Sequence, residues 1–355
     1  MSETTTHLLI PFASLSSEAA VKYLQDLKLP NLRQLLGTLT LVDSDIGTEE
    51  SFSPPHERAL AKAQGLLVVD GCIPWAAQRA AVLGLENAQT QAWGFVTLCH
   101  SVVGMGSMTM EDPDQLSVSE TESRQLFADM ASYFSEDGLT LHYLEPKLWL
   151  CSGEPLRDVR TASFDRVIGK DLRDWQPVDG QPTAEPPQGG LAPSGGSAAH
   201  AVASVGAQKL RRLQNEMQML LYTHTVNDAR SRSNAALINS VYFHGNGELA
   251  NDNVQVNTDI TSSITMPRSL ADAALKEDWP AWAKAWELLD AMVCTDLLIR
   301  AQAGESVTLT LCGERSALRY ELKPQSSLKK FAIKMISNLK SVFGIQPAHL
   351  LPKQL

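Results

Sequence analysis

The sequence lacks the paired cysteines of a disulfide scaffold or a zinc knuckle. Its five cysteines are odd in number and widely spaced, and no two of them form a CxxC pair: Cys72, Cys99, Cys151, Cys294 and Cys312. Most lie in apolar runs such as "KLWLC" and "LTLC", which is typical of buried thiols in a reducing compartment. The cysteines therefore predict core thiols, without structural zinc or redox chemistry.

Long hydrophobic runs are also missing. The N-terminal stretch "MSETTTHLLIPFAS" has no basic region, and its apolar run is too short for a signal peptide or a membrane span. We therefore expect a cytoplasmic protein with no membrane span. The 44% of hydrophobic residues in 355 positions supply one large core or two modest ones.

Positive charge is scarce, since 30 Lys and Arg stand against 40 Asp and Glu, for a net charge of -10. Nucleic-acid-binding proteins normally carry a basic face, so we expect no nucleic acid partner. The motifs GxSxG, HExxH and GxxxxGK[ST] are absent as well. Their absence removes the usual signatures of hydrolases, zinc proteases and P-loop nucleotide binding.

Alternating strand and helix patterns predict an α/β protein. Strand-like "HLLI" precedes the helical "SSEAAVKYLQDL" and "LPNLRQLL", and strand-like "AWGFVTLCHSVVG" precedes a helix for which Ser117 and Glu120 have the spacing of a capping box. This order favours a sandwich with a mostly parallel central sheet. A flexible Pro/Gly/Ser-rich insertion, residues 176–206, separates a first part, 1–175, from a second part, 207–355.

Two helical patterns in the second part lead to hypotheses about surfaces that bind a partner. Trp279, Trp282 and Trp286 recur at spacings of three and four, which is typical of a buried helix face and also suits a surface that binds a protein partner. The C-terminal "SSLKKFAIKMISNLKSVFG" alternates Lys with apolar residues as a basic amphipathic helix. Such a helix suits an acidic partner, or it docks on the body of the protein.

The most polar stretch is "LLYTHTVNDARSRSNAALINSVYFHGNG", residues 220–247. His224, Asn227 and Arg230 follow an apolar helix at intervals of three, and imidazole, amide and guanidinium groups together suit an anionic ligand. The alternative is that Asn227 and Asn234 turn the chain and that His224 neutralises a helix C-terminus. The closing "HGNG" suits either a phosphate or a tight turn.

The same stretch resembles the motif "HPVNxxRxxxGxxxANxxxxxGxG" of the archaeal-type cofactor-independent phosphoglycerate mutases, members of the alkaline-phosphatase superfamily. Six residues keep its spacing: His224, Asn227, Arg230, Asn239, Gly245 and Gly247. Thr225, Asn234 and Ile238 replace its Pro, Gly and Ala. The resemblance implies an alkaline-phosphatase-like three-layer sandwich.

Further segments resemble a bacterial family described either as phosphoglycerate mutase-like or as RpfE-type regulatory proteins. These segments are "RLQNEMQMLLYTH", "TASFDRVIGKDL", "EDWPAWAKAWELLDA" and "LTLCGERSA". Membership in that family implies a degenerate member of the superfamily with a regulatory role.

The chemistry that the resemblance implies requires two metals, held by Asp and His, and a Ser nucleophile. Where the superfamily has its first Asp, this chain has Pro11, Phe12 and Ala13, and at the late Asp-His pair it has "CGERSA". After His244 the only histidine is His349, and the nucleophile region reads "SFSPPHERALA", with Ser51 and Ser53 as weak replacements. We therefore predict no mutase activity, no metal and no cofactor.

The sequence thus favours a mutase-like protein with a regulatory or ligand-binding role. A candidate anion pocket for a phosphorylated small molecule comprises His224, Asn227, Arg230, Asn239 and His244. The alternative is an active mutase or phosphatase with Mn²⁺ or Zn²⁺ on a different set: His56, Glu57, Asp70, His100 and the carboxylates around Asp112. A third possibility is that no pocket remains and that the fold itself satisfies these polar groups.

Overall fold

The structure, a computed structural model, describes residues 6–180, 205–249 and 264–322. Contacts divide the chain into two compact units: unit 1 holds residues 1–49 and 258–355, and unit 2 holds residues 50–257. Most of the predicted insertion, 176–206, and the predicted C-terminal helix lie outside the described residues. The division of one α/β domain into 1–175 and 207–355 stays a prediction.

Unit 1 is built on a five-stranded mixed sheet in the order β11-β1-β12-β13-β2. β1 pairs in parallel with β11 and β12, whereas the pairs β12–β13 and β13–β2 are antiparallel. The strands are β1 (Thr6–Ile10), β2 (Thr40–Ile46), β11 (Ile264–Thr265), β12 (Val307–Cys312) and β13 (Ser316–Glu321). The run "VTLTLCGERSALRYEL" forms the hairpin of β12 and β13.

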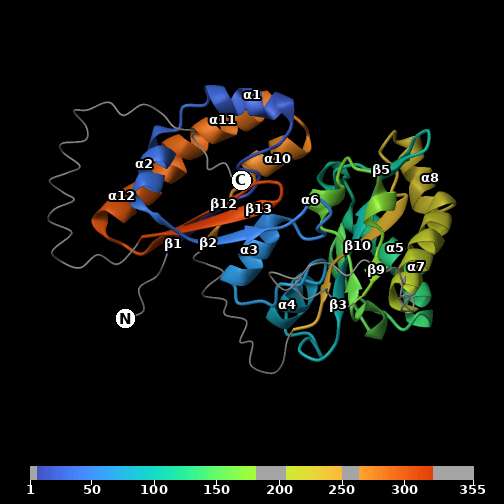
Figure 1. Cartoon of the computed structure of the whole chain (residues 1–355). Coiled ribbons are helices and arrows are strands. Elements are labelled where there is room, and N and C mark those ends of the chain that lie inside the picture. Colours follow the sequence, from blue (N-terminus) through green and yellow to red (C-terminus); the bar gives the residue numbers. More distant parts are fainter. Residues whose placement is uncertain (1–5, 181–204, 250–263, 323–355) are drawn as a thin grey trace, which may run out of the picture. The chain divides into compact units, whose positions relative to one another are not determined.

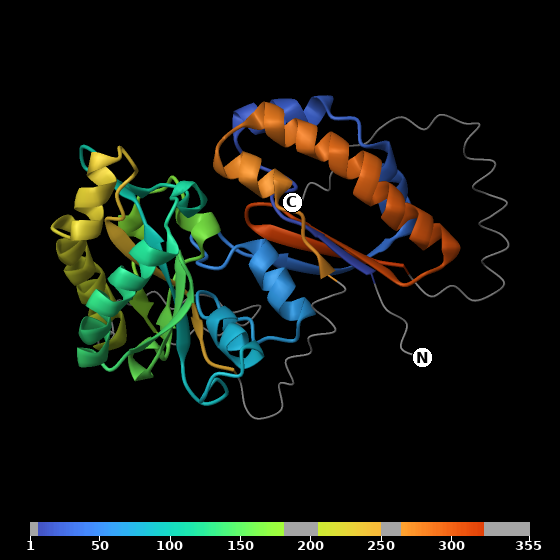
Figure 2. The same cartoon turned by 180° about the vertical axis from the view of Figure 1, so that it is seen from behind.

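The helices of unit 1 cover one face of this sheet (Figures 1 and 2). Alternate strand residues such as Leu8, Ile10, Leu309 and Leu311 point into the shared core, as the two-residue period of a β-strand requires. The helices are α1 (Glu18–Asp26), α2 (Pro30–Thr38), α10 (Ser269–Leu275), α11 (Trp279–Leu289) and α12 (Thr295–Ala303).

A π-helical segment, Asp290–Cys294, connects α11 to α12. The carboxylate of Asp290, which is buried, accepts a hydrogen bond of 2.7 Å from the backbone N–H of Leu32 in the first turn of α2. Because the residue preceding α2, Leu29, has no capping side chain, Asp290 satisfies donors that the helix itself cannot. Trp282 and Trp286 are fully buried, which confirms the core interpretation for these two tryptophans.

Unit 2 contains a four-stranded antiparallel sheet in the order β10-β3-β7-β6. Two small antiparallel pairs, β4 with β5 and β8 with β9, complete its strands. Their bounds are β3 (Trp93–Cys99), β4 (Ser101–Val103), β5 (Met108–Met110), β6 (Thr140–Glu145), β7 (Leu148–Ser152), β8 (Val159–Arg160), β9 (Val178–Asp179) and β10 (Ser240–Gly247).

Helices lie against both faces of the four-stranded sheet. Val96 and Leu98 of β3 share a core with α5 and α7, whereas Trp93, on the opposite face, shares a core with alanines of α4. The helices are α3 (Pro55–Ala63), α4 (Trp75–Val82), α5 (Glu120–Glu136), α6 (Phe164–Val167), α7 (Val205–Tyr222) and α8 (Thr225–Arg232), with 3-10 turns at Pro113–Gln115, Glu154–Leu156 and Leu172–Trp175.

Two details of the sequence prediction are corrected. The prediction of a mostly parallel sheet is wrong, because β10 returns antiparallel beside β3 and because the edge of the unit 1 sheet is also antiparallel. The capping box of α5 is formed by Ser119 and Glu122 instead of Ser117 and Glu120. The run "SVSETES" offers both S-x-x-E spacings, and the helix uses the later one.

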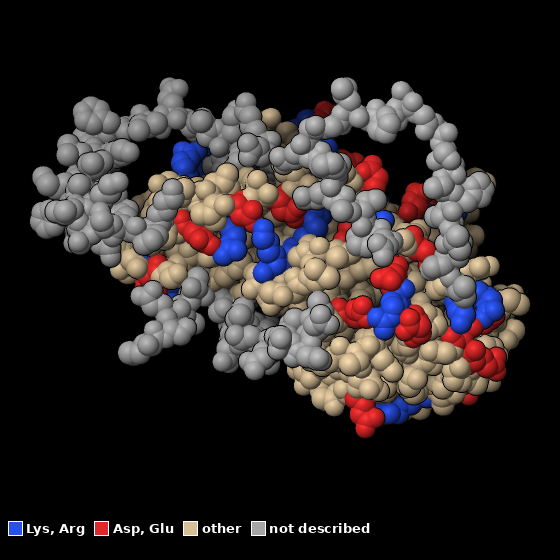
Figure 3. Space-filling view, turned by 60° about the horizontal axis from the view of Figure 1, so that its bottom comes forward, with Lys and Arg blue, Asp and Glu red and all other residues tan. Residues whose placement is uncertain are grey.

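The burial of the cysteines and the mixed charges of the surface agree with the expectations from composition. Four of the five free cysteines are buried and Cys72 is partly buried. Figure 3 shows acidic and basic side chains interspersed on the face in view. Within the described ranges, no helix combines the length and apolarity that a membrane crossing requires.

Candidate functional site

The polar stretch 220–247 forms a corner, which we define as the residues from Leu221 at the end of α7, through α8, to Ser240 at the start of β10. His224 is the N-cap of α8, and its Nδ1 accepts a hydrogen bond of 3.2 Å from the N–H of Val226. Its Nε2 lies 3.0 Å from a carboxylate oxygen of Asp129 on α5. His224 therefore begins a new helix and ties it to α5.

Asn227 holds the two ends of the corner together. Its buried side-chain amide donates to the carbonyl oxygens of Leu221 and Ile238 at 2.8 and 2.7 Å, and its Oδ1 accepts from the N–H of Ile238 at 3.0 Å. The amide thus forms hydrogen bonds with the end of α7 and with the residue two positions before β10. Asn227 therefore stabilises a turn of the chain, which is the role that the alternative interpretation gave to this residue.

Arg230 is buried in the same corner, with 4% of its surface exposed. Its Nε donates to the carbonyl of Ala236 at 2.6 Å, and its Nη1 donates to the carbonyl of Ser117 at 2.8 Å and to a carboxylate oxygen of Glu122 at 2.9 Å. Burial acts to raise the pKa of Glu122, but the hydrogen bonds from Ser119 and Arg230 outweigh it and hold that pKa below its ordinary value. The guanidinium therefore has Glu122 as its anionic partner in this structure.

Two replacements relative to the mutase motif preserve the backbone of the corner. Thr225 occupies the first position of α8, where proline, the mutase residue, is also favoured. Asn234 has a φ of 55°, a left-handed conformation that glycine adopts most easily and that asparagine tolerates better than most residues. Ile238, the third replacement, is fully buried in the core of unit 2. Thr225 and Asn234 therefore suit the backbone that this chain adopts at the corner.

Asn239 and His244 lie farther along the chain. Asn239 exchanges two hydrogen bonds with the backbone of Ser101, at 2.7 and 2.8 Å, and so joins the start of β10 to β4. His244 lies five residues later on β10, about 16 Å away in an extended strand. Its Nε2 is 2.9 Å from the hydroxyl of Thr97. Burial lowers the pKa of His244 to about 3, so the ring is neutral at physiological pH.

The "HGNG" run closes β10 with a β-bulge between His244 and Gly247. Gly245 has a φ of 61°, and a Cβ atom on Gly247 would lie 2.8 Å from the carbonyl oxygen of Cys72. The glycines thus permit a close approach to the segment before α4, which is the turn interpretation of this run. Asn246, between them, is fully buried, and both polar atoms of its amide lack a hydrogen-bond partner among the described residues.

Of the five predicted pocket residues, the structure brings His224, Asn227 and Arg230 into the corner, with Asn239 at its exit. It places His244 elsewhere, with its ring centroid 4.3 Å from that of Phe164. The site role of all five stays a prediction. Asp129, Glu122 and Ser117 are the partners that sequence reasoning missed, because they lie on segments about a hundred residues earlier in the chain.

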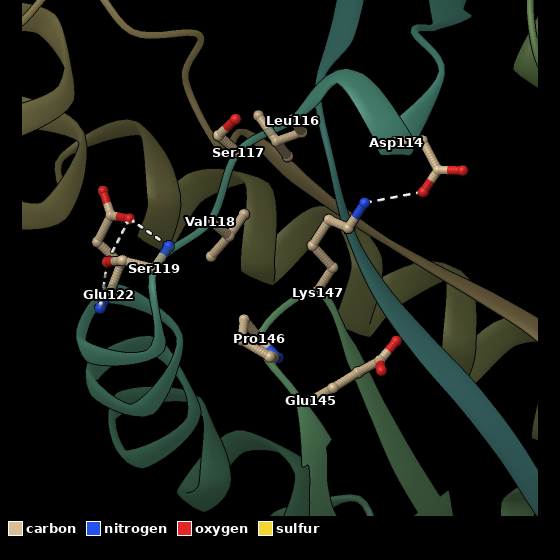
Figure 4. Close-up of a pocket in the computed structure, with 9 residues that line it drawn as sticks. All are labelled: Asp114, Leu116, Ser117, Val118, Ser119, Glu122, Glu145, Pro146 and Lys147. Carbon is tan, nitrogen blue, oxygen red and sulfur yellow. Dashed lines mark hydrogen bonds and ion pairs between the residues drawn. The ribbon is translucent and has the colours of Figure 1, made fainter.

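An open pocket of about 650 Å³ lies beside the partners of Arg230 (Figure 4). Its lining includes Ser117 and Glu122, which both accept hydrogen bonds from Arg230. Lys147 is paired with Asp114 at 2.8 Å, and Glu145 adds a third carboxylate to the lining. Three carboxylates and one ammonium group give the lining a negative charge, so a phosphate ester would bind beside it only if a carboxylate such as Glu122 moved away.

The alternative catalytic set falls into two places in unit 2. His56 and Glu57 belong to what we call the α3–α6 junction, residues 51–58 with 160–165. His56 Nε2 lies 2.8 Å from a carboxylate oxygen of Asp165, with both side chains buried, and Glu57 accepts a hydrogen bond from the Ser163 hydroxyl. Burial raises the pKa of Glu57, and the charge of His56 and the Ser163 hydrogen bond offset this only in part.

Ser53 and Asp70 also belong to the polar interior around the junction. The hydroxyl of Ser53 accepts a hydrogen bond of 2.9 Å from the N–H of Gly71, and its own N–H donates to Asp70 at 2.8 Å. Asp70 is in turn paired with Arg160. The Ser53 hydroxyl is therefore held by the backbone, and no base that would activate it as a nucleophile is among these contacts.

The remaining members of the alternative set, His100 and Asp112, lie outside the α3–α6 junction. His100 Nδ1 lies 2.7 Å from the carbonyl of Leu237, and Asp112 caps the 3-10 turn at Pro113–Gln115. Among residues 6–180, 205–249 and 264–322, no three His, Cys, Asp or Glu side chains are grouped so that they could hold a metal ion. The proposed alternative ligands thus do not converge.

Comparison with known proteins gives a distant likeness in fold. No family model matches the chain, and no curated protein matches it. The solved structures that it resembles include a cofactor-independent phosphoglycerate mutase from Thermoplasma acidophilum DSM 1728, with 12% identity, a TM-score of 0.34 and 91% of each chain covered. They also include the PH0037 protein from Pyrococcus horikoshii, with 11% identity, a TM-score of 0.40 and coverage of 97% of this chain and 100% of that one. A likeness at this level transfers no function.

Proposed function

We propose that this chain is a mutase-like protein without phosphoryl-transfer activity, in which the mutase-type motif has an architectural role and the protein acts by binding. The observation that carries the proposal is the use of the motif's side chains. Asn227 and Arg230 donate hydrogen bonds to backbone carbonyls and to the carboxylate of Glu122, and Asn227 accepts one from a backbone N–H. Such groups stabilise a fold without any ligand.

The ends of the strands support the proposal. β1 is followed by Pro11, Phe12 and Ala13, which supply no ligand side chain. After β12, Glu314 accepts a hydrogen bond of 2.8 Å from the N–H of Ser16, and Arg315 lies 3.7 Å from a carboxylate oxygen of Glu49. Phosphoryl transfer needs concentrated positive charge at the transferring group, and the described residues at these strand ends do not gather it.

A phosphorylated small molecule remains the ligand class that the sequence favours. Its phosphate would reach Arg230 by displacing Glu122, the carboxylate that now accepts a hydrogen bond from this guanidinium. We propose such an exchange as the way in which a ligand would act on the corner, because one anion would replace another without leaving a buried guanidinium unpaired. Glu122 would then be released toward the pocket that it lines.

The second candidate is an active phosphoglycerate mutase or phosphatase that uses Mn²⁺ or Zn²⁺. The feature that favours it is the α3–α6 junction, where His56, Glu57 and Asp165 are buried or partly buried together. A group of ionisable residues with a perturbed pKa is a recognised sign of an active site. The hydrogen bonds to Ser163 and within the His56–Asp165 pair give an equally direct structural explanation.

Calorimetric titration with Mn²⁺, Zn²⁺ and 3-phosphoglycerate, with a coupled mutase assay on the same sample, distinguishes the two candidates. We expect no turnover with either metal. Binding of 3-phosphoglycerate that weakens in Arg230→Ala but is preserved in Arg232→Ala, the exposed arginine of the same helix, would support the exchange. Stoichiometric metal binding with turnover, lost in His56→Ala, would overturn the proposal.

A further inference from the structure

Helix α11 carries an exposed apolar strip beside the face that it packs into the core. Trp282, Trp286 and Leu289 pack into the core of unit 1. On the outer side, Leu288 is 52% exposed, and Met292, in the π-helical segment that follows, is 69% exposed. Contiguous exposed apolar side chains are typical of interaction surfaces, so this outer face indicates a missing partner.

The outer face has the shape of a groove. Its lining comes from α10, from α11 and from the π-helical segment, and it encloses about 360 Å³. The lining includes the small residues Ala273, Ala281 and Ala285 and the large apolar residues Leu288 and Met292. Small residues along a groove between two helices let a third helix approach closely, and large apolar neighbours then contact its side chains.

The chain contains one segment whose pattern matches this groove. Residues 326–343 lie outside the described residues, and their sequence places apolar side chains at intervals of three and four: Leu328, Phe331, Met335, Leu339 and Val342. These intervals are those of anchors that fill a helix-binding groove. The segment also follows β13 of the same unit directly, since Glu321 ends that strand and Leu322 packs against the unit 1 core.

Charge also favours this segment. Residues 323–355 contain six lysines and no Asp or Glu. Because the whole chain has a net charge of -10, the rest of the chain carries -16. Residues 269–303, which contain α10, α11 and α12, have six acidic and three basic residues. A basic segment is therefore attracted to the acidic helices around the groove, although Lys284 in the lining pairs with Glu287.

The connection is long enough to cross the width of one helix. From Leu322 to Leu328 the chain spans about 20 Å when extended, whereas a helix that packs on a sheet is about 10–12 Å across. We propose that residues 326–343 bind in cis to the groove between α10 and α11 of the same chain, through their apolar side chains, with their lysines toward the solvent.

Trypsin cleavage after Lys329, Lys330 and Lys334 in the full chain, followed by mass spectrometry, tests the proposal. Met292→Asp should speed this cleavage about tenfold, since burial of one apolar side chain is worth at least about 1.4 kcal/mol. Phe331→Asp should have a similar effect, and the double variant should be cleaved no faster than the faster single variant. Ile46→Asp, which changes a 74% exposed residue of β2, is the control and should leave the rate unchanged.

Three results would overturn the proposal. One is an unchanged cleavage rate in Met292→Asp with an unchanged melting temperature. Another is an additive effect in the double variant, because independent effects exclude direct contact. The third is a wild-type dimer that Met292→Asp converts to a monomer in sedimentation, which would make a second copy of the chain the occupant of the groove.

Discussion

The corner and the α3–α6 junction both bury polar side chains in unit 2, but they do so with different chemistry. In the corner, an amide and a guanidinium form hydrogen bonds chiefly to the main chain, and the one buried charge is paired with Glu122. In the junction, side chains pair with side chains, His56 with Asp165 and Glu57 with Ser163, and burial raises the pKa of Glu57. The corner should therefore be the more sensitive to loss of shape, and the two regions should differ in how their stability depends on pH.

Arg230→Ala should have the largest effect. It removes the hydrogen bonds to Ala236 and Ser117 and leaves Glu122 without its cation, so the free energy of unfolding should fall by about 3–5 kcal/mol. Urea denaturation followed by circular dichroism measures it. Arg232→Ala, an exposed position on the same helix, should change stability by about 0.5 kcal/mol or less. Equal effects of the two substitutions would refute the structural role of Arg230.

Asn227→Ala should have the next largest effect. The free energy of unfolding should fall by about 2–4 kcal/mol, because three backbone groups at Leu221 and Ile238 lose their hydrogen-bond partner. Asn227→Asp is the sharper variant. It keeps the size and the acceptor for Ile238 N–H but removes both donors. If Asn227→Asp were as stable as the wild type in the same urea experiment, the two bonds to carbonyl oxygens would not matter.

The two regions should differ in the sign of their pH dependence. The raised pKa of Glu57 means that its contribution is fully present below its ordinary value of 4.5 and is lost as the pH rises through the folded-state pKa. The lowered pKa of Glu122 gives a contribution that is present above that value and is lost as the pH falls through its folded-state pKa. The windows therefore lie on opposite sides of pH 4.5.

Unfolding free energies from pH 3 to pH 8 check this contrast. Glu57→Gln should flatten the profile above pH 4.5, and Glu122→Gln should flatten it below. A Glu57→Gln profile that stays parallel to the wild type across the whole range would contradict the raised pKa. The Glu122→Gln protein, measured in parallel, shows whether any change is specific to the junction.

The smallest effects should come from restoring the mutase residues to the corner. Asn234→Gly at a φ of 55°, and Thr225→Pro at the first position of α8, should each change stability by about 1 kcal/mol or less, because both residues suit the existing backbone. Asn234→Ala should cost about 1 kcal/mol. Thermal melting of the three variants decides the order, and a strongly destabilised Thr225→Pro would mean that α8 begins elsewhere.

Local features of the fold were predictable because they depend on neighbouring residues. Pro30 at the start of α2 and the amphipathic pattern of α7 are of this kind. Strand direction was not, because β3 and β10 pair residues such as Phe95 and His244 that lie far apart in the sequence. The hydrogen-bond partners of the candidate site residues could not be predicted, for the same reason. Nothing near His56 points to Asp165, and nothing near Arg230 points to Glu122.

The spacing of the motif was informative in a different way. It located Asn227 and Arg230 as linked residues, but it could not say whether they face a ligand or their own backbone. Both residues are polar groups of high hydrogen-bonding capacity, and either use satisfies them. Only the positions of Leu221, Ile238 and Ala236 around them separate the two uses.

The most direct test is amide hydrogen exchange at Ile238, whose N–H donates to Asn227 in the corner. If the corner is architectural, this N–H should exchange only through global unfolding in the free protein, and 3-phosphoglycerate at concentrations below those that raise global stability should leave its rate unchanged. An Ile238 N–H that exchanges rapidly in the free protein and becomes protected only when 3-phosphoglycerate is added would contradict the account.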